Sequence, residues 1–299
     1  MTNVQESELS RCIREKSRKI ADPAGRTVSI LEDSAATELA EQFQCGVPKI
    51  YRDALRLGIC PYRYVRNREV ISVQEQLELA LSRVVVIGLG GLGGQIVLLL
   101  ARVGLGHLVV VDCDVFDETN LNRQALSSID TIGKSKSEVA AATLTSINPG
   151  VEVTSIQARI EAATVETILG GSNVIVDALD NIPDRMLLGE AAKDLGIPLV
   201  HGAIAGFEGQ LMTVFPKDNG LQQLYGDVRA ERNDPQRPEA LLGVPTLTPA
   251  IVGSFQAMEV IKIILNRGRL LRNRMVHFDL ERGELNHLFF EGPDSAPSS

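Results

Sequence analysis

The stretch Arg83-Val-Val-Val-Ile-Gly-Leu-Gly-Gly-Leu-Gly93 decides the fold. Its short apolar run is typical of a buried strand, and a Gly-x-Gly-x-x-Gly pattern at Gly88, Gly90 and Gly93 follows at once. A helical stretch to Val103 and a second apolar run, 108–112, come next. This order predicts a βαβ unit of a doubly wound, Rossmann-like α/β fold.

The glycine pattern also indicates a ligand. A turn of this kind lets backbone N–H groups approach a phosphate at the N-terminus of a helix, where the helix dipole favours negative charge. Since strand and helix signals flank the pattern, we expect nucleotide binding, and the alternative is a tight turn that binds nothing.

Strands and helices keep alternating along the chain. This predicts a mostly parallel sheet with antiparallel C-terminal strands. We expect helices over 136–147, 163–169, 186–195 and 249–265, and strands over 151–156, 173–178, 198–202, 209–215, 275–279 and 284–290, the last two as a hairpin.

The chain divides into three parts by composition. Residues 1–60 are polar and helix-leaning, which predicts a small helical N-terminal extension without strands. The main domain covers 61–290 and includes a long polar loop, 216–249, and residues 291–299 are expected to be a disordered tail.

Charge and cysteine content exclude several classes of protein. The 299 residues carry 38 acidic and 30 basic side chains, and a net charge of -8 argues against a nucleic-acid partner. The cysteines, Cys12, Cys45, Cys60 and Cys113, form no Cys-x-x-Cys pair, so we expect neither zinc nor disulfides. The charged segment 1–18 lacks a signal core, and glycines interrupt the apolar run 84–103, so we expect a cytoplasmic protein without a membrane segment.

Polar residues after the second strand distinguish between nucleotides. Asp112 ends that strand, where a carboxylate would accept hydrogen bonds from ribose hydroxyls of either NAD or ATP. Asp114, Asn120, Asn122 and Arg123 follow directly, and an arginine fork can bind phosphate oxygens of a triphosphate. Such a cluster has no evident use in an NAD enzyme, so ATP is favoured.

Two further side chains could complete a phosphate site. Lys136 lies at the start of a predicted helix and could reach the same phosphates, or it could be an ordinary solvated lysine, as we expect of Lys134. Asp177 and Asp180 flank the C-terminal end of another strand, and Asp180 is the candidate ligand for Mg²⁺. Its alternative role is to cap the next helix.

With these motifs in place, the chain resembles the ThiF/MoeB/HesA family of ubiquitin-activating-type adenylyltransferases from about Arg63 to Phe290. The resemblance rests on several spaced motifs: Arg63-Tyr-Val-Arg66, Gly88-Leu-Gly-Gly-Leu-Gly93, Asp112-x-Asp-Val-x-x-x-Thr-Asn-Leu-Asn-Arg-Gln124, Gly133-x-x-Lys136, Asp177-x-x-Asp-Asn181, Glu208-Gly-Gln210 and Gln256-Ala-Met-Glu-x-Ile-Lys262.

The resemblance implies an activity. ATP and Mg²⁺ would activate the C-terminal glycine carboxylate of a small ubiquitin-like sulfur carrier that ends in Gly-Gly, giving an acyl-adenylate and pyrophosphate in a thiamine- or molybdopterin-type pathway. It also implies a homodimer in which Arg66 reaches the neighbouring subunit's site. The implied catalytic residues are Arg66, Arg123, Lys136 and Asp180, and the implied nucleotide contacts are Gly88, Gly90, Gly91, Gly93, Asp112, Asp114, Thr119, Asn120, Leu121, Asn122, Arg123, Lys136, Asp180 and Asn181.

The chain departs from the family pattern in its cysteines. Many relatives carry two Cys-x-x-Cys pairs for zinc, and some use a cysteine in the loop that corresponds to 216–249, but this sequence has no cysteine after Cys113. We therefore expect no zinc and adenylation without covalent catalysis. The alternatives are a tRNA-modifying dehydratase of the same fold, an NAD-dependent dehydrogenase, and a scaffold that only binds the carrier.

Overall fold

A computed structural model describes residues 7–226, 231–232 and 234–290. The predicted βαβ unit is confirmed as β4 (Arg83–Ile87), α5 (Gly91–Val103) and β5 (His107–Val111). The two strands pair in parallel, with Arg83 opposite His107 and Ile87 opposite Val111. Their carboxyl ends therefore lie side by side, which places the glycine turn next to Asp112.

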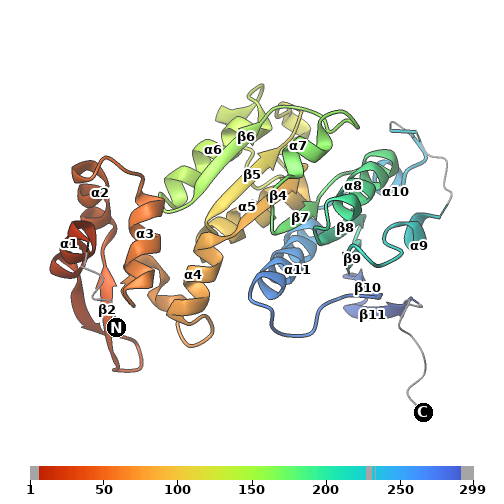
Figure 1. The fold of residues 1–299 in the computed structure, drawn as a ribbon. Helices are drawn as coiled ribbons and strands as arrows, with labels where there is room; N and C mark the ends of the chain where they lie inside the picture. Colours follow the sequence, from red (N-terminus) through yellow and green to blue (C-terminus); the bar gives the residue numbers. More distant parts are fainter. Residues whose placement is uncertain (1–6, 227–230, 233, 291–299) are drawn as a thin grey trace, which may run out of the picture.

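Within the described residues these strands belong to an eight-stranded sheet, in the order β11-β10-β9-β8-β7-β4-β5-β6 (Figure 1). The parallel part contains β6 (Glu152–Ile156), β5, β4, β7 (Val174–Asp177) and β8 (Leu199–Ala205). The strands β9 (Glu208–Val214), β10 (Arg274–Asp279) and β11 (Glu284–Phe289) add antiparallel pairs, as predicted. From β4 the chain continues to β5 and β6 on one side, and it then crosses to β7 and β8 on the other side of β4. Ligands bind beyond the strand ends at such a switch point.

Helices cover both faces of the sheet. One hydrophobic cluster joins α5, α6 (Lys136–Ile147) and α11 (Leu247–Ile264) to one face, and a second joins α7 (Val165–Leu169) and α8 (Ile182–Asp194) to the other. By length and composition α11 could span a bilayer, but almost half of its residues are buried against the domain. It packs on the sheet as a core helix of a layered α/β arrangement.

The N-terminal extension differs from the expectation of an all-helical unit. It contains α1 (Glu8–Lys16), α2 (Asp33–Gln42) and α3 (Val47–Arg56), but also a small sheet of β1 (Arg18–Ala21), β2 (Thr27–Leu31) and β3 (Cys60–Pro61). A turn joins β1 to β2, and Asp22 stabilises it by accepting hydrogen bonds from the backbone N–H groups of Ala24 and Arg26. The expectation was wrong because such short strands are easily hidden among polar residues.

Side chains of a 3₁₀ helix, Tyr62–Asn67, attach this extension to the main domain. This helix precedes α4 (Val73–Leu81). Arg63 forms an ion pair with Asp33 and donates to the backbone oxygen of Ile147 over 2.7 Å. The hydroxyl of Tyr64 accepts a hydrogen bond from Asn148 at 2.7 Å. A division of the chain near residue 60 stays a prediction.

The connection between β9 and α11 (215–246, hereafter the β9–α11 connection) carries two short helices in its described residues, α9 (Gln222–Tyr225) and α10 (Pro238–Leu242). The sequence predicted a long loop here, because four or five residues are too few to show a helical period. The predicted disordered tail, 291–299, lies outside the described residues.

Candidate active site

A cleft of about 490 Å³ lies beyond the carboxyl ends of β4, β5 and β7. This is the position that the topology predicts. Many of the predicted nucleotide contacts line it, namely Gly88, Gly90, Gly91, Asp112, Asp114, Asn120, Arg123, Lys136, Asp180 and Asn181.

The glycines of the turn have different tasks. Gly88 has φ +90°, and a Cβ there would lie 2.6 Å from the carbonyl oxygen of Ala178. A Cβ on Gly93 would lie 1.8 Å from the oxygen of Gly88, so these two glycines allow the turn to pack against itself and against the strand beside it. At Gly90 the nearest group is Gln124 Nε2 at 3.7 Å, so space remains above the turn. The structure thus places Gly90 and Gly91 at the cleft and Gly93 beneath it.

Asp112 joins the two loops that form the floor of the cleft. Its Oδ2 accepts a hydrogen bond from the backbone N–H of Leu89 at 2.7 Å, and its Oδ1 accepts one from Asp114 at 2.8 Å. Burial raises the pKa of Asp112, while Lys136 acts in the opposite direction. Each carboxylate oxygen keeps a further lone pair, so a role in binding ribose is compatible with this arrangement.

Lys136 is buried, so the alternative of a solvated lysine is wrong for this residue. Only 9% of its side chain is exposed, and its Nζ lies 3.1 Å from Oδ2 of Asp114. Burial acts to raise the pKa of Asp114, but the neighbouring Lys136 outweighs it and leaves that pKa lowered. By contrast, Lys134 is exposed, as expected.

The segment 119–123 is only partly brought to the cleft. Asn120 and Arg123 line it, and Arg123 donates to the backbone oxygen of Thr119 at 2.7 Å and to Asn122 Oδ1 at 2.9 Å. A 3₁₀ turn over Glu118–Asn120 directs consecutive side chains to different sides. Of the other predicted contacts, Thr119 and Leu121 are exposed away from the cleft residues, and Asn122 lines a neighbouring cavity.

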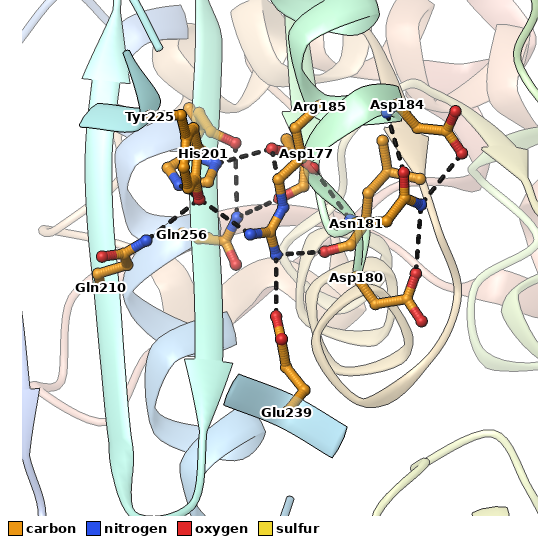
Figure 2. Close-up of polar contacts among 12 residues, drawn as sticks. Asp177, Asp180, Asn181, Asp184, Arg185, His201, Gln210, Tyr225, Glu239 and Gln256 are labelled. Atoms are coloured by element: carbon orange, nitrogen blue, oxygen red, sulfur yellow. Dashed lines mark hydrogen bonds and ion pairs between the residues drawn. The ribbon is translucent and has the colours of Figure 1, made fainter. Parts of the chain in front are cut away.

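Asp180 and Asn181 stand at the start of α8 (Figure 2). Asn181 is the N-cap, because its side chain accepts a hydrogen bond from the backbone N–H of Asp184 at 2.9 Å. The capping role considered for Asp180 is therefore wrong. The side chain of Asp180 is 71% exposed, and its Oδ2 lies 3.9 Å from Arg237. Its oxygens remain accessible to a hard cation such as Mg²⁺.

Several cations of the cleft were missed in the sequence. Arg159, Arg185, Arg232 and Arg237 line it together with Arg123 and Lys136. Arg232 binds Oδ1 of Asp184 at 2.7 Å, and the Nε of Arg237 is buried without a hydrogen-bond partner. A set of fixed cations with a free buried donor fits a polyphosphate, so the residues present fit ATP. In the sequence, the arginines within 229–237 could have indicated that this segment contributes cations to the cleft.

A buried polar network beside the cleft was also missed. Asp177, which the sequence placed at the strand end, is fully buried, and its Oδ2 lies 2.7 Å from Nδ1 of His201 (Figure 2). Arg185 and Tyr225 continue this network. Asp177 therefore has a partner inside the protein and does not face a metal.

Arg66 lies apart from these residues. It is exposed on the 3₁₀ helix after the N-terminal extension and is not among the residues that line the cleft. Its reach into a neighbouring subunit's site stays a prediction.

Comparison with known proteins identifies the family of the chain. A model of the ThiF family matches residues 64–295. The SAMP-activating enzyme E1 of Haloferax volcanii is 41% identical over 219 residues, which are 73% of this chain and 80% of that protein. An adenylyltransferase and sulfurtransferase MOCS3 of Arabidopsis thaliana is 35% identical over 284 residues, and although these are 91% of this chain they are only 60% of that protein.

A solved structure shows the same fold at lower identity. Escherichia coli MccB, solved with ATP, superposes with a TM-score of 0.68 at 18% identity, over 87% of this chain and 81% of MccB. The family model and the Haloferax relative show that the chain belongs to the ThiF family, and relatives named sulfur carrier protein adenylyltransferase, at 34–36% identity, show that it is an adenylyltransferase of the ThiF/MoeB type.

Proposed function

We propose that this chain uses ATP and Mg²⁺ to adenylate the C-terminal glycine carboxylate of a ubiquitin-like sulfur carrier protein that ends in Gly-Gly. The observation that carries the proposal is the meeting of the glycine turn, Lys136, Arg123 and Asp180 in one cleft at the switch point of the sheet. Relatives that are named sulfur carrier protein ThiS adenylyltransferase and probable molybdopterin-synthase adenylyltransferase support a sulfur-carrier substrate, in a thiamine-type or molybdopterin-type pathway.

The reaction requires positioning and charge neutralisation. The carrier carboxylate is itself the nucleophile on the α-phosphate, so no general base is needed, and pyrophosphate leaves. Lys136 and Arg123 are the side chains that neutralise charge on the phosphates. Asp180 would hold Mg²⁺, which supplies a further positive charge to the phosphate oxygens when bound.

A second cavity of about 360 Å³ supports a peptide substrate. It shares Asp180, Asn181 and Arg185 with the cleft, and its wall on β8 and β9 includes the small residues Ala203, Ala205 and Gly209. An extended tail of two glycines could pass along such a wall to the cleft. We therefore place the carrier tail in this cavity, hereafter the tail cavity.

Covalent catalysis is not part of the proposal. The sequence has no cysteine in 216–249. Cys113 lines the cleft, but burial raises the pKa of its thiol and the carboxylates of Asp114 and Asp112 add to the effect, which disfavours a thiolate. The remaining expectations, namely no zinc, a homodimer completed by Arg66 and a cytoplasmic location, belong to the same proposal.

Exchange of pyrophosphate into ATP tests the function. We expect exchange that requires Mg²⁺ and a carrier ending in Gly-Gly, and that an Arg123→Ala variant reduces strongly. Exchange at the wild-type rate in that variant would contradict the mechanism. No exchange with any candidate carrier would favour a tRNA substrate or a non-catalytic scaffold, which binding of bulk tRNA and of carriers would distinguish.

A further inference from the structure

The hydroxyl of Tyr225 joins the β9–α11 connection to three other elements. Tyr225 ends α9, and its hydroxyl oxygen lies 2.9 Å from a terminal nitrogen of Arg185 on α8. It also lies 3.1 Å from Nε2 of His201 on β8 and 3.2 Å from Nε2 of Gln210 on β9 (Figure 2). This oxygen atom therefore links α9 to one helix and to two strands of the sheet.

Counting protons assigns one state to this network. Arg185 and Gln210 donate to the hydroxyl, which accepts two hydrogen bonds, so its own proton goes to Nε2 of His201. The other ring nitrogen of His201 then carries hydrogen and donates to Asp177 over 2.7 Å. The hydroxyl of Tyr225 and both ring nitrogens of His201 are satisfied when His201 is neutral with its proton on Nδ1.

Arg185 extends the same network to the second helix of the connection. Its side chain is 4% exposed, and it donates to the backbone oxygen of Leu179, next to Asp180, at 2.5 Å. The same terminal nitrogen lies 3.8 Å from a carboxylate oxygen of Glu239 on α10. Both Tyr225 and Glu239 line the tail cavity, so the two contacts with Arg185 set the distance across it.

We propose that Tyr225 is a positioning residue for adenylation: through Arg185 and His201 it holds α9 and α10 against the strand ends and so shapes the tail cavity. The identity of the tail rests on the proposed function. If α9 moves away from the sheet, Arg185 and His201 each lose the hydrogen bond to Tyr225. Because both side chains are buried, leaving them without this partner costs free energy. The connection is therefore held in the arrangement that keeps the cavity formed.

Tyr225→Phe tests this because it removes only the hydroxyl and keeps the ring, which stands edge-on to His201. We expect the KM for the carrier to rise about tenfold, as for the loss of a hydrogen bond to a charged group, while kcat and the KM for ATP change less than about twofold. Tyr51→Phe is the matched control, because the buried hydroxyl of Tyr51 binds Asp33 in the N-terminal extension. We expect it to leave the KM for the carrier unchanged.

The pH profile separates positioning from a general structural role. The charged and titratable groups that face His201 are Asp177 on β7, Arg185 on α8 and Tyr225 on α9. Protonated His201 would turn an N–H toward a hydroxyl that already accepts two hydrogen bonds. Because burial lowers the pKa of His201 below its usual value of about 6.5, we expect the wild-type KM for the carrier to be constant near neutral pH and to rise only at more acidic pH, and the Tyr225→Phe value to be high and flat.

Amide hydrogen exchange measures how firmly Tyr225 holds the β9–α11 connection, and it needs no catalysed reaction. In Tyr225→Phe we expect faster exchange in peptides that cover 222–225 and 238–242, and no change in peptides from α2 and α3. Unchanged exchange there, together with a carrier KM within about twofold of wild type, overturns the inference. If wild type shows no carrier-dependent reaction, the proposed function fails, and amide exchange alone then decides whether Tyr225 positions the connection.

Discussion

The carboxylate of Asp112 accepts a hydrogen bond from the backbone N–H of Leu89 over 2.7 Å. Leu89 lies inside the glycine turn after β4, and Asp112 directly follows β5. Because the other oxygen of Asp112 binds the N–H of Asp114, one side chain fixes both loops below the cleft. A residue predicted to contact ribose therefore also holds the turn that would bind phosphate.

Asp112→Asn should weaken both the fold and nucleotide binding. The amide group can replace only one acceptor oxygen, so one backbone N–H is left facing a donor, at a cost of about 1–3 kcal/mol in the free energy of unfolding. We expect urea unfolding to show this loss and ATP titration to show a weaker affinity. Asp130→Asn, on an exposed 3₁₀ turn, is the control and should match wild type. Equal stability of Asp112→Asn and wild type would contradict the role of Asp112 in holding the two loops together.

The sequence was sufficient for the main sheet because its buried parallel strands are apolar runs of Val and Ile between glycine turns. It could not predict which way Thr119, Leu121 and Asn122 point, since this depends on a single 3₁₀ turn. The network around Arg185 and Tyr225 was missed for another reason: these residues are 40 positions apart, and only the packing of α9 brings them together.

The glycine turn offers a pair of variants with opposite effects. Gly93→Ala places a Cβ at 1.8 Å from the oxygen of Gly88, which a packed turn cannot accommodate, so we expect a large loss of Tm or insoluble protein. Gly90→Ala meets its nearest group at 3.7 Å and should fold normally. Because its new methyl group occupies the space above the turn, we expect weaker ATP binding with an unchanged Tm. Normal ATP affinity in Gly90→Ala would argue against phosphate binding at this turn.

Lys136 and Lys134 form a natural comparison, since they lie two residues apart and only Lys136 is buried at the cleft. Lys136→Ala should lower the rate of pyrophosphate exchange about 100-fold or more, as expected when a preorganised charge on the reacting phosphates is removed. Lys134→Ala should leave the rate within about twofold, because an exposed lysine contributes little. Similar rates for the two variants would remove Lys136 from the catalytic residues.

Asp180 should affect metal dependence without affecting stability. Its carboxylate is largely exposed, and its contacts are a long hydrogen bond of 3.4 Å from Asn181 Nδ2 and an approach of 3.9 Å to Arg237, so we expect Asp180→Asn to change the free energy of unfolding by less than about 0.5 kcal/mol. The Mg²⁺ concentration for half-maximal exchange should rise. Asp194→Asn, exposed at the other end of α8, is the control and should keep the wild-type Mg²⁺ dependence. A normal Mg²⁺ requirement in Asp180→Asn would place the metal on other groups.

His201 should make stability depend on pH. Burial lowers the pKa of His201, against the opposing effect of Asp177. The unfolded chain then takes up a proton near the usual histidine pKa, about 6.5, while the folded chain stays neutral. The resulting contribution to stability is full above that pH and is lost as the pH falls from there toward the folded pKa.

Urea unfolding of wild type and His201→Gln between about pH 5.5 and 8 measures this contribution. We expect the wild-type free energy of unfolding to fall with a slope of at most about 1.4 kcal/mol per pH unit from this histidine, and the gap between the two proteins to narrow as the pH falls. His287→Gln, a variant of an exposed histidine on β11, should keep the wild-type slope. A gap that widened in acid would mean that the pKa of His201 is raised in the folded protein, and a constant gap would mean that folding does not shift this pKa; either result would contradict the neutral state assigned to His201.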